Sequence, residues 1–134
     1  MKSKFLILIL LLGGALMAQD YSANVLQSTN EASTRYHLDA KQNAQMLIIE
    51  ARRERNLAEI ETLKETDYTL YLKKKKAIRE NTIGSVNKIL NNEQRAILDQ
   101  EKTAYRLETS DLIKQYKTEG KSKSEISLLL LERG

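Results

Sequence analysis

One short stretch constrains the fold of this chain more than any other, because it indicates where one helix ends and the next begins. The stretch is Leu90-Asn91-Asn92-Glu93-Gln94. Asn91 is a residue type that accepts a hydrogen bond from a backbone amide in the first turn of a helix. Gln94 stands three residues later, where its side chain can reach back to the amide of Asn91. We therefore expect a helix to end near Leu90 and another to start at Asn92.

A second copy of this signal lies upstream, in Leu38-Asp39-Ala40-Lys41-Gln42. It has the same order of an apolar residue, a capping residue, two further residues and a glutamine. The two copies predict two corners where helices begin. The helix-corner motifs consist of Leu38, Asp39, Gln42, Leu90, Asn91 and Gln94.

The composition favours long helices between and after these corners. The chain has no proline and 5 glycines, and 30% of its residues are charged whereas 5% are aromatic. Such a composition is typical of long amphipathic helices. We expect an all-α fold in which helices at about 40–65 and 68–90 form a long antiparallel hairpin. A third long helix at about 92–117 and a short C-terminal helix at about 123–132 follow.

The apolar side chains of the first long helix are expected to face inward with mostly i, i+3, i+4 spacing. They are Ala40, Ala44, Leu47, Ala51, Leu57, Ile60 and Leu63. The connection to the second helix is short, and Thr66 or Asp67 can cap that helix. A short connection predicts that the two helices pack antiparallel.

Residues 1–18 have the pattern of a secretory signal peptide. Lys2 and Lys4 precede an unbroken apolar run over residues 5–12, and small residues follow it. Cleavage after Ala18 or after Ala15 fits the pattern. An uncleaved membrane anchor is the less favoured alternative, because the apolar run is shorter than the ~20 residues that span a bilayer. The segment predicts a periplasmic or otherwise extracytoplasmic protein.

The remainder of the chain divides into a lead-in and one domain. Residues 19–30 are polar and show no clear period, and residues 31–37 have room for one or two helical turns. We expect residues 19–37 to be a mobile lead-in and residues 38–134 to form a single helical domain.

Few residues in the chain are suited to catalysis or to metal binding. His37 is the only histidine and there is no cysteine, so a tetrahedral zinc site would depend on carboxylates. The sequence has no glycine-rich phosphate loop. The formal net charge is +4, and Lys2 and Lys4 would leave with the signal peptide. We therefore expect no enzyme, no cofactor, no bound metal and no nucleic-acid partner.

Basic residues form the first candidate binding surface. They are Arg52, Arg53, Arg55, Lys73, Lys74, Lys75 and Lys76, with Arg79 nearby. One interpretation is a solvated helix surface. The other is a basic patch that attracts acidic partners before apolar contacts form.

A leucine-rich tail is the second candidate surface. It consists of Leu128, Leu129, Leu130 and Leu131, behind a further capping box from Ser122 to Glu125. The leucines either close the core of this domain or form an apolar patch that docks onto a partner.

The paired corner motifs, together with the signal peptide, resemble the Spy/CpxP family of periplasmic helical stress proteins. Members carry two Leu-Thr-x-x-Gln motifs, each at a helix start, and the resemblance covers about residues 31–107. Asn91 and Asp39 stand where the family has threonine, and all three residue types can cap a helix. The His and Met ligands of the metal-responsive relatives are missing in this chain.

The resemblance implies a hairpin-based helical protein, often an antiparallel dimer with a curved cradle. It also implies ATP-independent chaperone activity or inhibition of an envelope-stress sensor kinase. Our first hypothesis is an exported binding protein that holds unfolded clients. The alternative is a regulatory or structural partner of one specific envelope protein. A two-helix hairpin buries little surface alone, which favours a homodimer.

Overall fold

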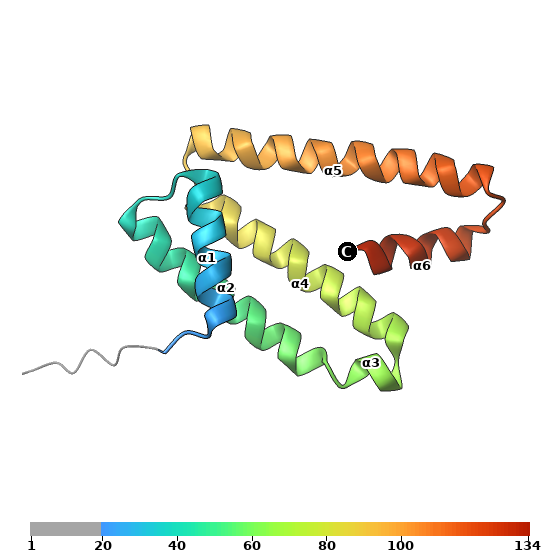
Figure 1. The fold of residues 1–134 in the computed structure, drawn as a ribbon, viewed down its shortest axis with the longest axis horizontal. Helices are drawn as coiled ribbons and strands as arrows, with labels where there is room; N and C mark the ends of the chain where they lie inside the picture. The colour runs from blue at the N-terminus through green and yellow to red at the C-terminus, as the bar shows by residue number, and fades with distance from the viewer. Residues whose placement is uncertain (1–19) are drawn as a thin grey trace, which may run out of the picture.

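The computed structural model describes residues 20–134, and every regular element within them is a helix (Figure 1). The elements are α1 (Ala23–Tyr36), α2 (Ala40–Ile60), α3 (Leu63–Thr66), α4 (Tyr68–Ile89), α5 (Asn92–Thr118) and α6 (Lys123–Arg133). The expected all-α fold is thus confirmed. No helix within the described residues combines the length and apolar character needed to cross a membrane. The expected signal peptide, residues 1–18, lies outside the described residues.

Helices α2 and α4 pack side by side and run in opposite directions, as expected for a hairpin (Figure 1). Two apolar clusters hold them together. The first lies near the corner end, where Met46 and Ile49 of α2 meet Val86, Leu90 and Leu98. The second lies toward the other end of the hairpin and consists of Ile60, Tyr71 and Leu72. The hairpin therefore has a core at both ends.

The buried face of α2 differs from the expected one. Met46 is fully buried and Ile49 is buried, whereas Ala40 and Ala44 are exposed. Of the expected inward residues, Ile60 is buried and Leu57 is partly buried. Burying Met46 and Ile49 removes more apolar area from water than burying alanines would. The helix is therefore oriented with these larger side chains toward the core.

The three predicted capping boxes are confirmed. Asp39 caps α2, Asn91 caps α5 and Ser122 caps α6, and in each case the reciprocal side chain bonds back to the capping residue's amide. Asp67, one of the two predicted candidates, caps α4 by accepting from the amide of Leu70 at 3.0 Å. These caps account for the close agreement between predicted and observed helix starts.

The two corner motifs bond directly to each other, although 52 residues separate their glutamines. The Gln42 amide group donates to Oε1 of Gln94 at 2.7 Å, and Gln94 donates in return to Oε1 of Gln42 at 3.0 Å. Each glutamine also donates to a carbonyl just before the other cap, Gln42 to Ile89 and Gln94 to His37. The starts of α2 and α5 are therefore joined by a two-way lock, which we call the glutamine lock.

The segment expected as a mobile lead-in contains a 14-residue helix, α1, packed on α2. Ser22 caps it, and Val25, Thr29, Ala32 and Tyr36 are buried. Those positions follow helical spacing. The apolar periodicity was not evident in the sequence because the buried stripe includes a threonine and lies among polar residues. The helical body therefore begins at Ala23 rather than at residue 38.

The first long helix is shorter than the expected span to about residue 65. It ends at Ile60, and a turn at Glu61 and Thr62 separates it from the single-turn helix α3. The amide of Glu61 donates to the Ala58 carbonyl, three residues back, which tightens the last turn. The break lets Leu63 pack against the second apolar cluster at the tip of the hairpin.

Helices α5 and α6 form the open part of the molecule. From the corner, α5 diverges from α4, and α6 folds back between the two (Figure 1). Gly120 makes the reversal with a φ of 78°, a conformation that glycine adopts without strain. Ile126 of α6 is buried, and Leu131 packs against the second apolar cluster. The observed α6 agrees with the expected short C-terminal helix.

Candidate partner-binding groove

The divergence of α4 and α5 leaves a groove of about 850 Å³, which α6 enters from one end. Its apolar lining consists of Tyr36, Leu57, Ile78, Ile83, Leu98, Tyr105 and Leu131. Its basic lining consists of Arg35, Arg53, Lys75, Lys76, Arg79, Lys102 and Arg106. The groove thus combines aliphatic and aromatic side chains with several basic ones.

The acidic side chains of the groove are already paired. Glu80 pairs with Lys76 at 3.7 Å, and Asp99 pairs with Lys102 at 3.6 Å. Glu101 pairs with Arg35 at 3.4 Å. Within this described lining, Lys75, Arg79 and Arg106 have no carboxylate partner. The groove therefore carries an uncompensated positive charge beside its apolar surface.

Tyr36 connects α1 to α5 at the groove wall. Its hydroxyl donates to Oε2 of Glu101 at 2.6 Å. Burial, followed by the hydrogen bond and the charge of Glu101, raises the pKa of Tyr36 to about 12. The tyrosine therefore stays protonated and remains a donor well into the alkaline range.

Tyr105 connects three helices at the opposite part of the groove. The guanidinium of Arg79, on α4, lies 4.2 Å from the centre of its ring, and that of Arg133, on α6, lies 4.6 Å away. Arg133 also donates to Thr109 Oγ1 at 2.7 Å. Cation–π contacts of this kind contribute ~0.5–1 kcal/mol each at exposed sites. They hold α6 in place and position Arg79 along the groove.

Arg53 is a predicted surface residue whose charge is partly satisfied inside the fold. Its Nε lies 2.6 Å from Oε2 of the buried Glu50, and its Nη2 donates to Ser28 of α1 at 3.2 Å. Arg53 therefore contributes to the groove wall mainly by fixing α1 on α2.

The predicted basic residues do not form a single surface. Arg53, Lys75 and Lys76 line the groove, together with Arg79. Arg52, Arg55, Lys73 and Lys74 do not line it. Successive residues of a helix point about 100° apart, so a run of four lysines spreads around the helix and only some of them face the groove. The structure thus divides the expected patch in two.

The leucine tail is also divided. Leu131 lines the groove and packs on the second apolar cluster, whereas Leu128 is 39% exposed. Leu129 and Leu130 are partly buried. The tail therefore contributes to the internal packing and still presents one leucine to solvent.

The helix-corner residues are structural. Gln42, Leu90 and Gln94 are buried, and Leu38 packs against the first apolar cluster. The capping residues Asp39 and Asn91 are exposed at the corner, away from the groove lining. These motifs hold the hairpin and α5 together and thereby set where the groove opens.

Several groove residues were not predicted from the sequence: Arg35, Tyr36, Lys102, Tyr105 and Arg106. The first two lie in α1, the segment expected to be mobile. A sequence signal existed for the others, because Leu98, Lys102 and Tyr105 recur at i, i+4 and i+7 along one face of α5. An apolar face flanked by cations is a pattern that indicates a binding surface as well as a core.

A comparison of the chain with family models, curated proteins and solved structures finds no match. Among residues 20–134, no group of three or more histidine, cysteine or acidic residues is placed to hold a metal ion. The expectations that the chain binds no metal and catalyses no reaction stay predictions.

Proposed function

We propose that this protein is an exported, ATP-independent chaperone-like protein that holds segments of unfolded clients in the groove between α4, α5 and α6. The observation that carries the proposal is the lining of this groove. Lys75, Arg79 and Arg106 lack carboxylate partners, and the apolar side chains that line the groove beside them are buried or half-buried. Unfolded chains present acidic and apolar groups together, and the groove offers a complement to both.

The two kinds of surface would act at different stages of capture. Unpaired cations speed encounter with acidic segments through long-range attraction. Burial of apolar surface then holds the client. Apolar area covered on binding would contribute ~25 cal/mol per Å², and much of this gain would be offset by the loss of freedom on association. Binding of this strength is reversible, so release would need no nucleotide.

The paired corner motifs lend further support, because they resemble those of a family with chaperone members. The glutamine lock would hold the corner fixed, and α4 and α5 diverge from this corner. We also expect a homodimer, which would enlarge the groove surface, and the solution mass of the chain from residue 19 would test this.

The test of the proposal is suppression of aggregation of a chemically denatured client, without ATP, by the chain from residue 19. Lys75→Glu combined with Arg106→Glu should weaken suppression several-fold. The matched control is Lys73→Glu combined with Lys74→Glu, which changes the net charge equally but lies outside the groove lining. Circular dichroism would verify that both variants fold.

The result that would overturn the proposal is a wild-type chain that gives no suppression at a several-fold excess over the client. Equal loss in both paired variants would also contradict it, because net charge rather than the groove would then determine the activity.

The exposed Leu128 favours the second candidate, a regulatory or structural partner of one specific envelope protein such as a stress-sensor kinase. Its neighbour Ile126 is buried, so Leu128 lies on the outer side of an otherwise docked helix. Leu128→Ser should leave the fold and general aggregation suppression unchanged. Two results together would favour the second candidate. The wild-type chain would not suppress aggregation of the client, and Leu128→Ser would lose a specific complex that the wild type forms.

A further inference from the structure

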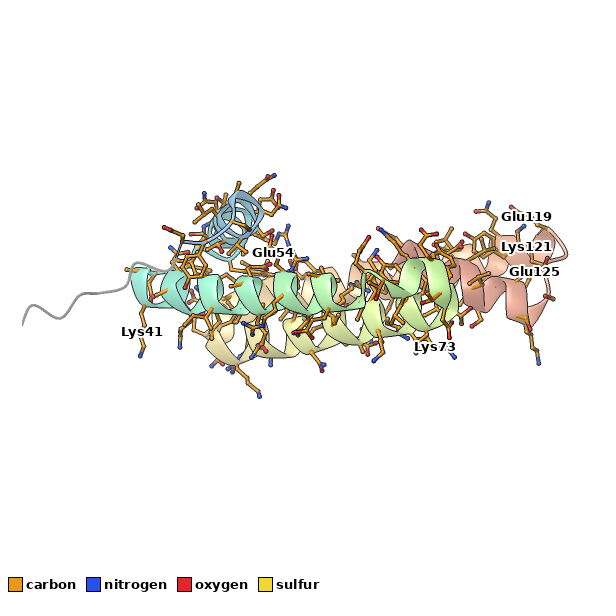
Figure 2. All side chains as sticks on the ribbon, turned by 90° about the horizontal axis from the view of Figure 1, so that it is seen from below. Lys41, Glu54, Lys73, Glu119, Lys121 and Glu125 are labelled. Atoms are coloured by element: carbon orange, nitrogen blue, oxygen red, sulfur yellow. The ribbon has the colours of Figure 1, made fainter. Side chains whose placement is uncertain are left out.

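The side of the α2–α4 hairpin opposite α1 carries basic side chains that the proposed function does not use. Figure 2 shows Lys41 and Lys73 projecting from that side, while Glu54 points toward α1. Arg52 and Arg55 follow Lys41 at i+11 and i+14 on α2, and Lys88 follows Lys73 at i+15 on α4, spacings that keep residues on one helix face. We define the basic face as Lys41, Arg52, Arg55, Lys73, Lys74 and Lys88.

The charge of the basic face is not neutralised within the described chain. None of its six side chains pairs with a carboxylate, whereas Lys76, on the groove side of the same helix, pairs with Glu80. Arg52 donates to Ser85 Oγ at 2.6 Å, which orients the guanidinium and leaves its charge intact. The acidic residues at the same helical spacing are Glu59 on α2 and Glu80 on α4, and Glu80 is paired with Lys76. The basic face therefore has a strong positive excess.

Two exposed aliphatic side chains lie among these cations. Ile48 of α2 is 60% exposed, and Leu70 of α4 is 38% exposed. Ile48 stands one heptad after Lys41, and Leu70 stands 18 residues before Lys88, so each shares the face of its helix with the cations. The same helix faces also carry the small residues Ala44, Ala77 and Gly84. Their side chains do not project far from the helices. A side chain at Gly84 would meet nothing within 4 Å.

We propose that the basic face docks on a membrane surface that contains anionic lipid headgroups. From Lys41 to Arg55 and from Lys73 to Lys88 the cations extend over ~20 Å along each helix. Cations spread along two adjacent antiparallel helices, with isolated aliphatic side chains between them, match the requirements of an anionic bilayer surface. A surface that binds a folded acidic protein is expected to have an apolar pocket for a central anchor residue. The residues of the basic face line no part of the groove, which favours a membrane surface over a folded protein as the partner.

Docking through this face would leave the groove open. Lys73 and Lys74 project away from the groove, whereas Lys75, Lys76 and Arg79 line it. The protein could therefore hold a client while its hairpin lies on the membrane. This inference concerns a different surface from the proposed client groove and does not depend on chaperone activity.

The test is cosedimentation of the chain from residue 19 with vesicles. The chain should bind vesicles that contain phosphatidylglycerol, bind vesicles of phosphatidylcholine alone much more weakly, and lose binding at high salt. Lys73→Glu combined with Lys74→Glu should weaken binding at least about tenfold, since each basic residue near an anionic surface contributes appreciably. Lys75→Glu combined with Arg106→Glu, the matched control in the groove, should retain affinity within about twofold.

A second variant tests the aliphatic contribution. Ile48→Ser removes an exposed side chain without changing the charge, and it should weaken vesicle binding by about threefold or more. Circular dichroism would confirm that each variant is folded.

Three results would overturn the inference. They are equal binding to both vesicle types, equal loss of binding in both paired variants, and binding of polyglutamate or duplex DNA by a chain that ignores anionic vesicles. Because aggregation suppression is measured without lipid, failure here leaves the proposed function standing, and the reverse also holds.

Discussion

Polar side chains have opposite environments at the corner and in the groove. At the corner, Gln42 and Gln94 are buried, and their amide groups bond to each other and to the backbone. In the groove, Lys75, Arg79 and Arg106 stand beside apolar walls without carboxylate partners. A satisfied buried polar group specifies one structure, and an unsatisfied exposed one is available to a partner. We therefore assign stability to the corner and binding to the groove.

Substitution at the glutamine lock should produce the largest effect. Gln94→Ala removes the bond to Gln42, the bond to the His37 carbonyl and the reciprocal cap at Asn91. We expect a loss of ~3 kcal/mol in the free energy of unfolding, because buried polar groups lose their partners. Chemical denaturation would measure it, with Gln100→Ala, an exposed position on α5, as the control. A loss below about 1 kcal/mol would contradict the assignment of stability to the corner.

The double variant sharpens this prediction. Because Gln42 and Gln94 bond to each other, Gln42→Ala combined with Gln94→Ala should lose less stability than the sum of the single variants. Additive losses would mean that the lock does not act as a pair.

The capping residues should show the next largest effect. Asp39→Ala and Asn91→Ala should each lower the free energy of unfolding by ~1 kcal/mol, because each removes an acceptor for an amide in the first turn. Asp39→Thr and Asn91→Thr should stay close to the wild type, since threonine can also cap. Thermal denaturation of the four variants gives the comparison. Negligible losses in the alanine variants would show that the caps contribute little here, and equal losses for threonine and alanine would show that threonine does not cap at these positions.

Tyr36 joins the two regions, and its effect should depend on pH. Its pKa is raised to about 12 from the ordinary 10.0, so the folded state favours the protonated phenol. The stability from this preference is present below pH 10, and it is lost as the pH rises through 12. Denaturation midpoints measured from pH 9 upward should therefore fall more steeply in the wild type than in Tyr36→Phe. Parallel curves would refute the role of the Glu101 bond.

Groove cations should give the smallest effect on stability. Lys75→Glu combined with Arg106→Glu should change the free energy of unfolding by no more than about 0.5 kcal/mol, because neither side chain pairs with a carboxylate. Urea denaturation of this variant beside the wild type provides the measurement. A large loss in the free energy of unfolding would show that these side chains support the fold. The contrast with the corner would then no longer hold.

Local signals in the sequence predicted the helix starts well. The capping boxes at Asp39, Asn91 and Ser122 each consist of residues that bond within one turn, so a single sequence contains all of their chemistry. The two copies of the corner motif indicated that two corners exist. Their direct bonding was not predicted, because it depends on how distant helices pack.

Tertiary packing decided the features that were not predicted. Helix α1 gains its stability from burying Val25, Ala32 and Tyr36 against partners that a local pattern cannot identify. The buried face of α2 was expected to include Ala40 and Ala44, which are exposed, whereas Met46 and Ile49 are buried in addition to the expected Ile60. The basic residues were recognised as a candidate surface, but their division between groove and basic face required the rotation of each helix.

The glutamine lock also sets an order of events in time. Each capping box bonds within one helical turn, so the first corner can exist for a period without its counterpart. During that period the amide of Gln42 has only water for the contacts that Gln94 and the Ile89 carbonyl later provide. Joining two sites 52 residues apart requires closure of a long loop, whose entropic cost exceeds that of closing a single helical turn. Local capping bonds form more readily than contacts between distant segments, so we expect the four hydrogen bonds of the glutamine lock to form after the capping boxes and to mark the step at which α2 and α5 join.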